Sequence, residues 1–170
     1  MTTTDPYAFL EACRRGNLEA VEQLYTADPS LLNAADSKGF TPLIIAVYND
    51  QPAVVDFLLS KGAKEDSGDN SGNTALMGVC FKGYEELAQK LMEAGADVNR
   101  TNGNGVTALS FAATFGRQRI AELLLKNGAD PNLRDVRGKS PLDHALVQEN
   151  WEMVKLLQQY TTDNTGAERE

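Results

Sequence analysis

Short apolar runs alternate with polar, glycine-containing segments along this chain of 170 residues. The runs at 54–59 (Val-Val-Asp-Phe-Leu-Leu) and 120–125 (Ile-Ala-Glu-Leu-Leu-Leu) have the apolar spacing of amphipathic helices. A shorter apolar run precedes each of them, and good N-cap residues stand before the shorter runs: Thr41, Thr74, Thr107 and Ser140. The pattern therefore predicts pairs of helices, in which a helix of about eight residues is followed by a second helix.

These signals recur with a fixed period of 33 residues. Turn glycines lie at Gly39, Gly72, Gly105 and Gly138. Glycines suited to a helix C-terminus lie at Gly62, Gly95 and Gly128. The two helices of a pair are expected to separate near Asp50, Gly83, Gly116 and Glu149. A repeated position has a structural reason to exist, so each must be assigned to the framework before it is considered for function.

The repeated unit resembles the ankyrin repeat. The resemblance rests on Asp36-x-x-Gly39-x-Thr41-Pro42-Leu43 with Gly62-Ala63, and on matching residues at 72–76 with 95–99, 105–109 with 128–132, and 138–142. It implies an all-α ankyrin repeat solenoid of about five stacked helix-turn-helix repeats with projecting β-hairpin loops. The family's histidine two residues after the proline is replaced by Ile44, Met77, Ser110 and Asp143, so a hydrogen bond common in the family is missing or altered.

The resemblance divides the chain into an N-terminal extension, an ankyrin domain and a tail. The extension comprises residues 1–4, the domain 5–160 and the tail 161–170. The expected repeats are 5–35, 36–68, 69–101, 102–134 and 135–160. The first looks like an N-terminal cap and has one extra residue between Gly16 and Asn33. The tail lacks periodic apolar positions, which predicts disorder.

Composition narrows the classes of function. The 16 Lys and Arg residues are outnumbered by 24 Asp and Glu, and the net charge of −8 disfavours nucleic acid and anionic lipid as partners. The N-terminus has no secretory signal pattern, and no apolar run reaches the roughly 20 residues that a membrane span needs. We therefore expect a soluble, cytoplasmic, monomeric protein.

No residue pattern indicates an enzyme, a cofactor site or a metal site. His144 is the single histidine, and its place in a helix beside Ala145 favours a structural role, although Asp143 with His144 is the least implausible acid-base pair. Cys13 and Cys80 occupy equivalent helical positions and are expected to be buried. The polar segment 66–72 has the wrong spacing for a calcium loop, and 103–105 lacks the strand that a dinucleotide loop requires.

The positions that differ between repeats carry the information about function. From the resemblance, the hairpin tips and the exposed side of each first helix form a concave surface. At these positions basic residues occur without acidic ones, and aromatic residues stand where the framework does not require them. The predicted partner-binding residues are Arg14, Arg15, Lys38, Phe40, Tyr48, Asn49, Phe81, Lys82, Val106, Thr114, Phe115, Arg137, Lys139 and Gln148. The alternative is that the aromatic rings pack on neighbouring repeats and the charges are merely solvated.

The sequence thus predicts a non-enzymatic protein-protein interaction module or scaffold, whose partner presents an acidic and apolar docking patch. The chain looks like small stand-alone ankyrin proteins of bacteria, some associated with catalases or toxins. That likeness leaves a second hypothesis open, a regulatory or inhibitory subunit of an enzyme or toxin. An enzyme that uses His144, or a nucleic-acid binder that uses the basic residues, ranks lower. Trp151 is expected to cover the end of the core.

Overall fold

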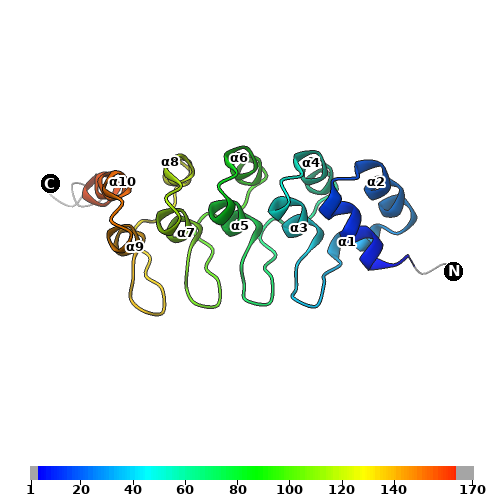
Figure 1. Ribbon diagram of the computed structural model, residues 1–170, viewed down its shortest axis with the longest axis horizontal. Coiled ribbons are helices and arrows are strands. Elements are labelled where there is room, and N and C mark those ends of the chain that lie inside the picture. The colour runs from blue at the N-terminus through cyan, green and yellow to red at the C-terminus, as the bar shows by residue number, and fades with distance from the viewer. Residues whose placement is uncertain (1–3, 164–170) are drawn as a thin grey trace. The chain divides into compact units, whose positions relative to one another are not determined.

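The computed structural model describes residues 4–163. These residues form helices arranged in consecutive pairs (Figure 1). The chain divides into two compact units, the first ending at Ala96 and the second beginning at Asp97. Within residues 4–163, none of the helices combines the length and the apolar character needed to cross a membrane.

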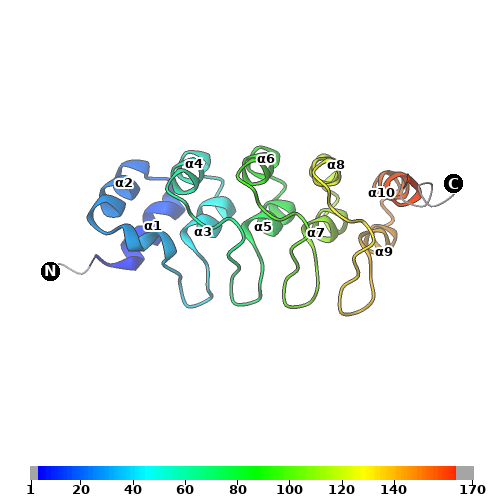
Figure 2. The ribbon, with the colours of Figure 1, turned by 180° about the vertical axis from the view of Figure 1, so that it is seen from behind.

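The first unit contains three helix pairs. They are α1 (Pro6–Arg15) with α2 (Leu18–Ala27), α3 (Pro42–Tyr48) with α4 (Pro52–Ser60), and α5 (Ala75–Lys82) with α6 (Glu85–Glu93). The helices α1, α3 and α5 pack in one layer and α2, α4 and α6 in a second (Figure 2). A short 3-10 helix, η1 (Pro29–Asn33), follows α2 and accommodates the extra residue of the first repeat.

The second unit contains two helix pairs, α7 (Ala108–Thr114) with α8 (Gln118–Lys126) and α9 (Pro141–Val147) with α10 (Trp151–Asp163). The first helices of the pairs, α7 and α9, pack on each other, and α10 packs on both α9 and α8. This arrangement repeats the two layers of the first unit and confirms the predicted stacking of helix pairs.

The helix α10 continues to Asp163, three residues past the predicted end of the ankyrin domain at Tyr160. Helical hydrogen bonding needs no apolar periodicity, so the helix can run past the last residue that the repeat pattern identifies. The remainder of the predicted tail, 164–170, and residues 1–3 of the predicted extension lie outside the described residues.

Local sequence explains where the short helices begin. The hydroxyl of each predicted N-cap accepts a hydrogen bond from the backbone N–H three residues later. The bonds run to Thr41 from Ile44, to Thr74 from Met77, to Thr107 from Ser110 and to Ser140 from Asp143. These four residues replace the family histidine, so that position still takes part in the cap. In three repeats the side chain at this position also bonds to the N-cap residue. Met77 Sδ accepts the N–H of Thr74, Ser110 Oγ accepts the hydroxyl of Thr107, and Asp143 Oδ2 accepts the N–H of Ser140.

The chain reverses between the two helices of each pair through one residue with positive φ. In the first pair this residue is Gly16 (φ 70°), and at the predicted breaks of the other four pairs it is Asp50 (50°), Gly83 (85°), Gly116 (66°) or Glu149 (53°). Glycine adopts this conformation without steric cost, whereas Asp50 and Glu149 adopt it against the preference of residues with a Cβ. The break between helices is therefore set by the framework even where glycine is absent.

Four loops precede the short helices α3, α5, α7 and α9 and fold back as hairpins, at 36–40, 69–73, 102–106 and 135–139. Each is closed by a backbone hydrogen bond between its first and last residues, as from Asp36 N–H to Phe40 O at 3.2 Å. Among residues 4–163 the only β pairing is an isolated bridge between Thr101 and Thr107. The predicted hairpins are thus held by turns rather than by extended strands.

The core of each unit lies between its two layers of helices. Leu43, Leu76 and Leu109, which share one repeat position, are all at most 2% exposed. Cys13 and Cys80 are buried, as predicted. Burial of these repeated positions leaves the hairpins and the outer turns of the short helices to carry the variable residues.

Candidate functional site

The predicted binding residues lie on the hairpins and near the ends of the first helix of each pair. The first unit carries Arg14, Arg15, Lys38, Phe40, Tyr48, Asn49, Phe81 and Lys82. The second carries Val106, Thr114, Phe115, Arg137, Lys139 and Gln148. The surroundings of these side chains differ between the two units, so each unit presents its own candidate site.

Two of the predicted cations in the first unit share one ion-pair partner, Glu11. Glu11 binds Arg14 Nη1 through Oε2 at 2.6 Å and Arg15 Nε through Oε1 at 2.8 Å. Hydrogen bonds from Arg15 and then Arg14 hold the pKa of Glu11 below its usual range. The prediction overlooked Glu11 because it considered only variable outward positions, although the i, i+3 and i, i+4 spacing within one helix identifies the contact.

Two of the aromatic residues in the first unit pack against each other. The rings of Phe40 and Tyr48 have centroids 5.9 Å apart and are both half-buried. Gly78 makes room for Tyr48, since a Cβ at residue 78 would lie 2.9 Å from the ring atom Cε2. Burial, with the nearby charge of Asp69, raises the pKa of Tyr48. The packing role considered as the alternative in the sequence analysis therefore fits Phe40 and Tyr48.

Phe81 and Phe115 are the more exposed aromatic residues of the predicted set. Phe81 lies near the end of α5 and is 42% exposed, and Phe115 follows α7 and is 40% exposed. Phe115 also stacks on Phe111, with ring centroids 6.3 Å apart and planes 11° apart. Phe115 is thus supported by Phe111 of its own unit, and a large part of the surface of both Phe81 and Phe115 remains accessible.

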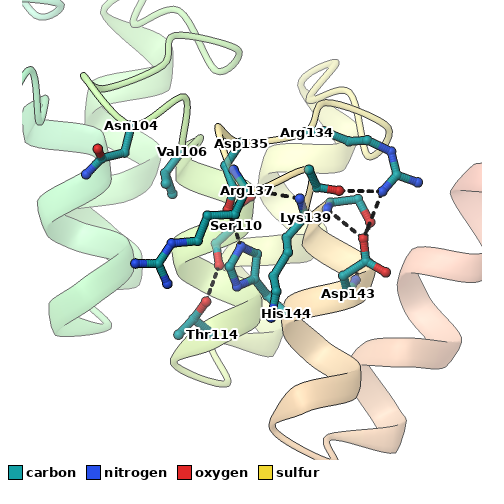
Figure 3. Close-up of polar contacts among 12 residues, drawn as sticks. Asn104, Val106, Ser110, Thr114, Arg134, Asp135, Arg137, Lys139, Asp143 and His144 are labelled. Carbon is teal, nitrogen blue, oxygen red and sulfur yellow. Dashed lines mark hydrogen bonds and ion pairs between the residues drawn. The ribbon is translucent and has the colours of Figure 1, made fainter.

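A hollow of about 330 Å³ opens between two hairpins of the second unit (Figure 3). We call it the hairpin hollow, and its lining residues are Asn104, Val106, Asp135, Val136, Arg137, Lys139 and His144. The sequence prediction included Val106, Arg137 and Lys139. It did not include Asn104, Val136 or His144 in the final set, because the hollow depends on how two hairpins approach each other.

Asp135 is the buried polar centre of the hairpin hollow, with its side chain 6% exposed. Its Oδ1 accepts the backbone N–H groups of Arg137 and Lys139 at 2.9 and 3.0 Å, and its Oδ2 lies 2.9 Å from His144 Nε2. The N–H of Lys139 is the largest influence that lowers the pKa of Asp135, followed by His144, and both act against the effect of burial. The carboxylate is therefore held ionised at neutral pH.

Asp143 and His144 do not form an acid-base pair. Asp143 Oδ2 accepts the N–H of Ser140 at 2.8 Å and binds Arg134 Nη1 at 3.0 Å, while the imidazole reaches Asp135 instead (Figure 3). The bond from the Ser140 N–H is the main reason that the pKa of Asp143 is lowered. The helix α9 thus directs the His144 imidazole to the preceding hairpin rather than to Asp143.

Other candidates for chemistry do not assemble in the part of the chain that the structure describes. In residues 4–163 there is no group of three or more His, Cys, Asp or Glu side chains that could hold a metal ion. Burial raises the pKa of the Cys13 thiol to about 12, which keeps it protonated and a poor nucleophile. Trp151 is 61% exposed, so the prediction that it covers the end of the core is wrong.

Comparison with known proteins identifies relatives of the chain. The sequence model of a protein family described as ankyrin repeats (3 copies) matches residues 9–102 and 76–167. The chain is also similar to BTB/POZ domain-containing protein 3 of Schizosaccharomyces pombe, with 40% identity over 65 residues. That alignment covers 36% of this chain and spans only 12% of the length of the relative.

Proposed function

This chain belongs to the ankyrin repeat family, whose repeats are generally protein-protein interaction modules, and we propose that it binds a partner protein through the hairpins and short helices of its units. Members of the family are typically non-enzymatic. The proposed role is accordingly one of binding rather than turnover, with the hairpin loops and the ends of α5 and α7 as the contact regions.

The observation that carries this proposal is the exposure of Phe81 and Phe115 at equivalent ends of two short helices. Aromatic residues with a rigid, partly packed ring and an open face are enriched among the residues that dominate binding energy in protein interfaces. Lys82 is exposed directly after Phe81 and adds a cation to the same helix end. Such a surface suits a partner with apolar pockets and acidic residues.

Affinity capture from native cells, followed by quantitative mass spectrometry, tests the proposal. The bait is either the wild-type chain or the double variant Phe81→Ala/Phe115→Ala. A specific partner should be recovered about tenfold less well or worse by the double variant, because each ring at a hot spot contributes on the order of 1 to 3 kcal/mol. Circular dichroism checks that the variant keeps its helices.

Trp151→Ala provides the matched control, since Trp151 is a still more exposed aromatic residue that lies at the start of α10, away from the hairpins. It should capture the partner as the wild type does. If the partner were lost with Trp151→Ala and retained by the double variant, binding would use the second-helix layer and the proposal would be wrong.

A further inference from the structure

We propose that the hairpin hollow recognises an acidic side chain of the partner protein, flanked in the partner sequence by an aliphatic residue. This inference rests on the proposed function and specifies the chemistry of one contact. It is carried by two cations that form no ion pair within residues 4–163, by the carboxylate and histidine beneath them, and by the apolar residues at the rim of the hollow.

The first step concerns charge. Arg137 and Lys139 are exposed, and neither forms an ion pair within residues 4–163. Both side chains extend away from Asp135, on the side of the hollow (Figure 3). Two adjacent cations at a concave site attract an anion more strongly than the same charges on a flat surface, because the surrounding protein limits screening by water.

The second step explains why the acidic residues beside the hollow do not neutralise these cations. Asp135 uses its oxygens for two backbone N–H groups and for His144. Asp143 is occupied by Ser140 and by Arg134. The acceptors nearest in the fold are thus already bonded, and the Arg137 and Lys139 side chains are left to bind a carboxylate from outside.

The third step concerns the hairpin that carries the cations. In all four hairpins the first residue accepts two backbone N–H groups from within its own loop. In the last hairpin Asp135 also bonds to the helix that follows, because His144 stands where the earlier repeats have Ile45, Gly78 and Phe111. His144 is therefore a positioning residue, which anchors the backbone from which Arg137 and Lys139 project.

The fourth step concerns the apolar residues that line the hairpin hollow. The N–H of Val136 donates to Asn104 O at 3.0 Å and so joins the two hairpins that border the hollow. Val136 is 72% exposed and Val106 is half-buried, and both line the hollow. An aliphatic side chain next to the acidic residue can cover these valines, which favours a protein segment over a free anion or a polyphosphate backbone.

Peptide selection provides a direct test. The full chain is immobilised and used to select from a phage-displayed library of random 12-residue peptides, with affinities of enriched peptides then measured by fluorescence anisotropy. Enriched peptides should contain Asp or Glu beside Leu, Ile or Val. Arg137→Gln/Lys139→Gln should bind those peptides about tenfold more weakly or worse, because both charge-assisted contacts are lost.

Three further variants sharpen the test. Arg119→Gln/Lys126→Gln removes the same charge from α8 of the same unit and should bind as the wild type does. Arg137→Glu/Lys139→Glu should select peptides that contain Lys or Arg instead. His144→Phe should weaken binding severalfold, whereas His144→Gln, which can still bond Asp135, should restore it, an outcome that a merely structural histidine would not give.

Several results would overturn the inference. They are enrichment without acidic residues, equal binding of acidic peptides to Arg137→Gln/Lys139→Gln, the absence of any enriched peptide, or displacement of the peptides by a single-stranded oligonucleotide at physiological salt. Non-acidic peptides whose binding depends on Phe81 and Phe115 would overturn this inference alone and leave the proposed function standing. The proposed function is tested separately, by the affinity capture of a partner with the wild-type chain and with Phe81→Ala/Phe115→Ala.

Discussion

The two units build the same helix pairs in the same 33-residue register, yet their variable positions behave differently. In the first unit Tyr48 is half-buried against Phe40, and Glu11 forms ion pairs with both Arg14 and Arg15. At the position of Tyr48, the second unit has Thr114, which is half-buried, and Val147, which is 62% exposed. Its cations at the hairpin hollow also lack ion-pair partners within residues 4–163. The residue at the Tyr48 position is thus packed in the second repeat and open in the last repeat, although each unit also has an exposed aromatic residue, Phe81 or Phe115.

A single repeat position illustrates how this difference arises. At Gly78 the absence of a side chain admits the ring of Tyr48, so an aromatic residue joins the packing of the first unit. In the last repeat the equivalent residue is His144, which bonds to Asp135 of its own hairpin. The same repeat position therefore receives a ring from the preceding repeat in one unit and anchors a hairpin in the other.

The largest expected effect comes from truncation after Asn132, which removes α9 and α10. Leu109 and Leu124 are fully buried, and the loss of the helices that pack on α7 and α8 exposes the apolar side of the remaining pair. We expect α7 and α8 to unfold or the fragment to aggregate, while the first unit keeps its own core. Hydrogen exchange with mass spectrometry should show lost protection at 108–126 and retained protection in α3 and α5.

Deletion of the chain end beyond the described helices is a control for that prediction. Deletion of residues 164–170 removes none of the described helices and should leave the melting temperature nearly unchanged. If the fragment ending at Asn132 melted as sharply and at the same temperature as the full chain, α7 and α8 would not depend on α9 and α10, and the packing argument would fail.

The next largest effect on stability is expected from the ring of Tyr48, which packs against Phe40. Tyr48→Ala should lower the free energy of unfolding by about 2 kcal/mol, because it removes a half-buried ring from Phe40 and leaves the space beside Gly78 empty. Val147→Ala changes the equivalent but exposed residue and should stay within about 0.5 kcal/mol of the wild type. Urea denaturation of both variants measures the difference.

Equal effects of these two substitutions would contradict the contrast between the units. A large loss from Val147→Ala would show that the second unit also packs its outward residue at this position. A negligible loss from Tyr48→Ala would show that the ring contributes little to the core and is available for binding, as the sequence analysis first proposed.

The helical framework could be predicted from the sequence because its local signals occur four times. N-caps, turn glycines and helix breaks each recur in register, so a single ambiguous residue such as Glu149 is corrected by Gly83 and Gly116 at the equivalent positions. Local rules of capping and backbone conformation act within a few residues of the chain, and the structure follows them at every pair.

The candidate site was less accessible to prediction because its contacts depend on distances between separate elements. The bond between His144 and Asp135 joins a helix to a hairpin nine residues away, and no repeat provides a second example of it. The packing of Tyr48 depends on Gly78, thirty residues later. By contrast, the pairing of Glu11 with Arg14 follows from helix spacing alone and was open to prediction.

A smaller effect is expected from pH. The folded-state pKa of Asp135 lies below its ordinary value of 3.8, so its ionised form stabilises the folded state above that pH, and the stabilisation is lost as the pH falls through the lowered pKa. Asp135→Asn keeps an oxygen for the N–H groups of Arg137 and Lys139, as Asn102 does in the preceding hairpin. Its unfolding free energy should therefore fall less steeply between about pH 5 and pH 2.

Urea denaturation at a series of pH values compares the two slopes. Asp143, whose pKa is also lowered, remains in the variant, so part of the acid dependence should persist. Identical slopes for the wild type and Asp135→Asn would mean that Asp135 is equally easy to protonate in the folded and unfolded states, and the bonds to His144, Arg137 and Lys139 would then have no energetic consequence.

The smallest effect distinguishes the two helix breaks that lack glycine. Glu149 has φ of 53° and Asp50 has φ of 50°, a conformation that costs a residue with a Cβ about 1 to 2 kcal/mol. Glu149→Gly should raise the free energy of unfolding by about 0.5 to 1 kcal/mol, because the removed strain exceeds the entropy that glycine adds to the unfolded chain. Asp50→Gly should gain less, since the short carboxylate of aspartate tolerates this conformation better than glutamate does. Paired urea titrations resolve the difference, and a larger gain at Asp50 than at Glu149 would show that backbone strain at the break is set by packing around it rather than by the side chain that occupies it.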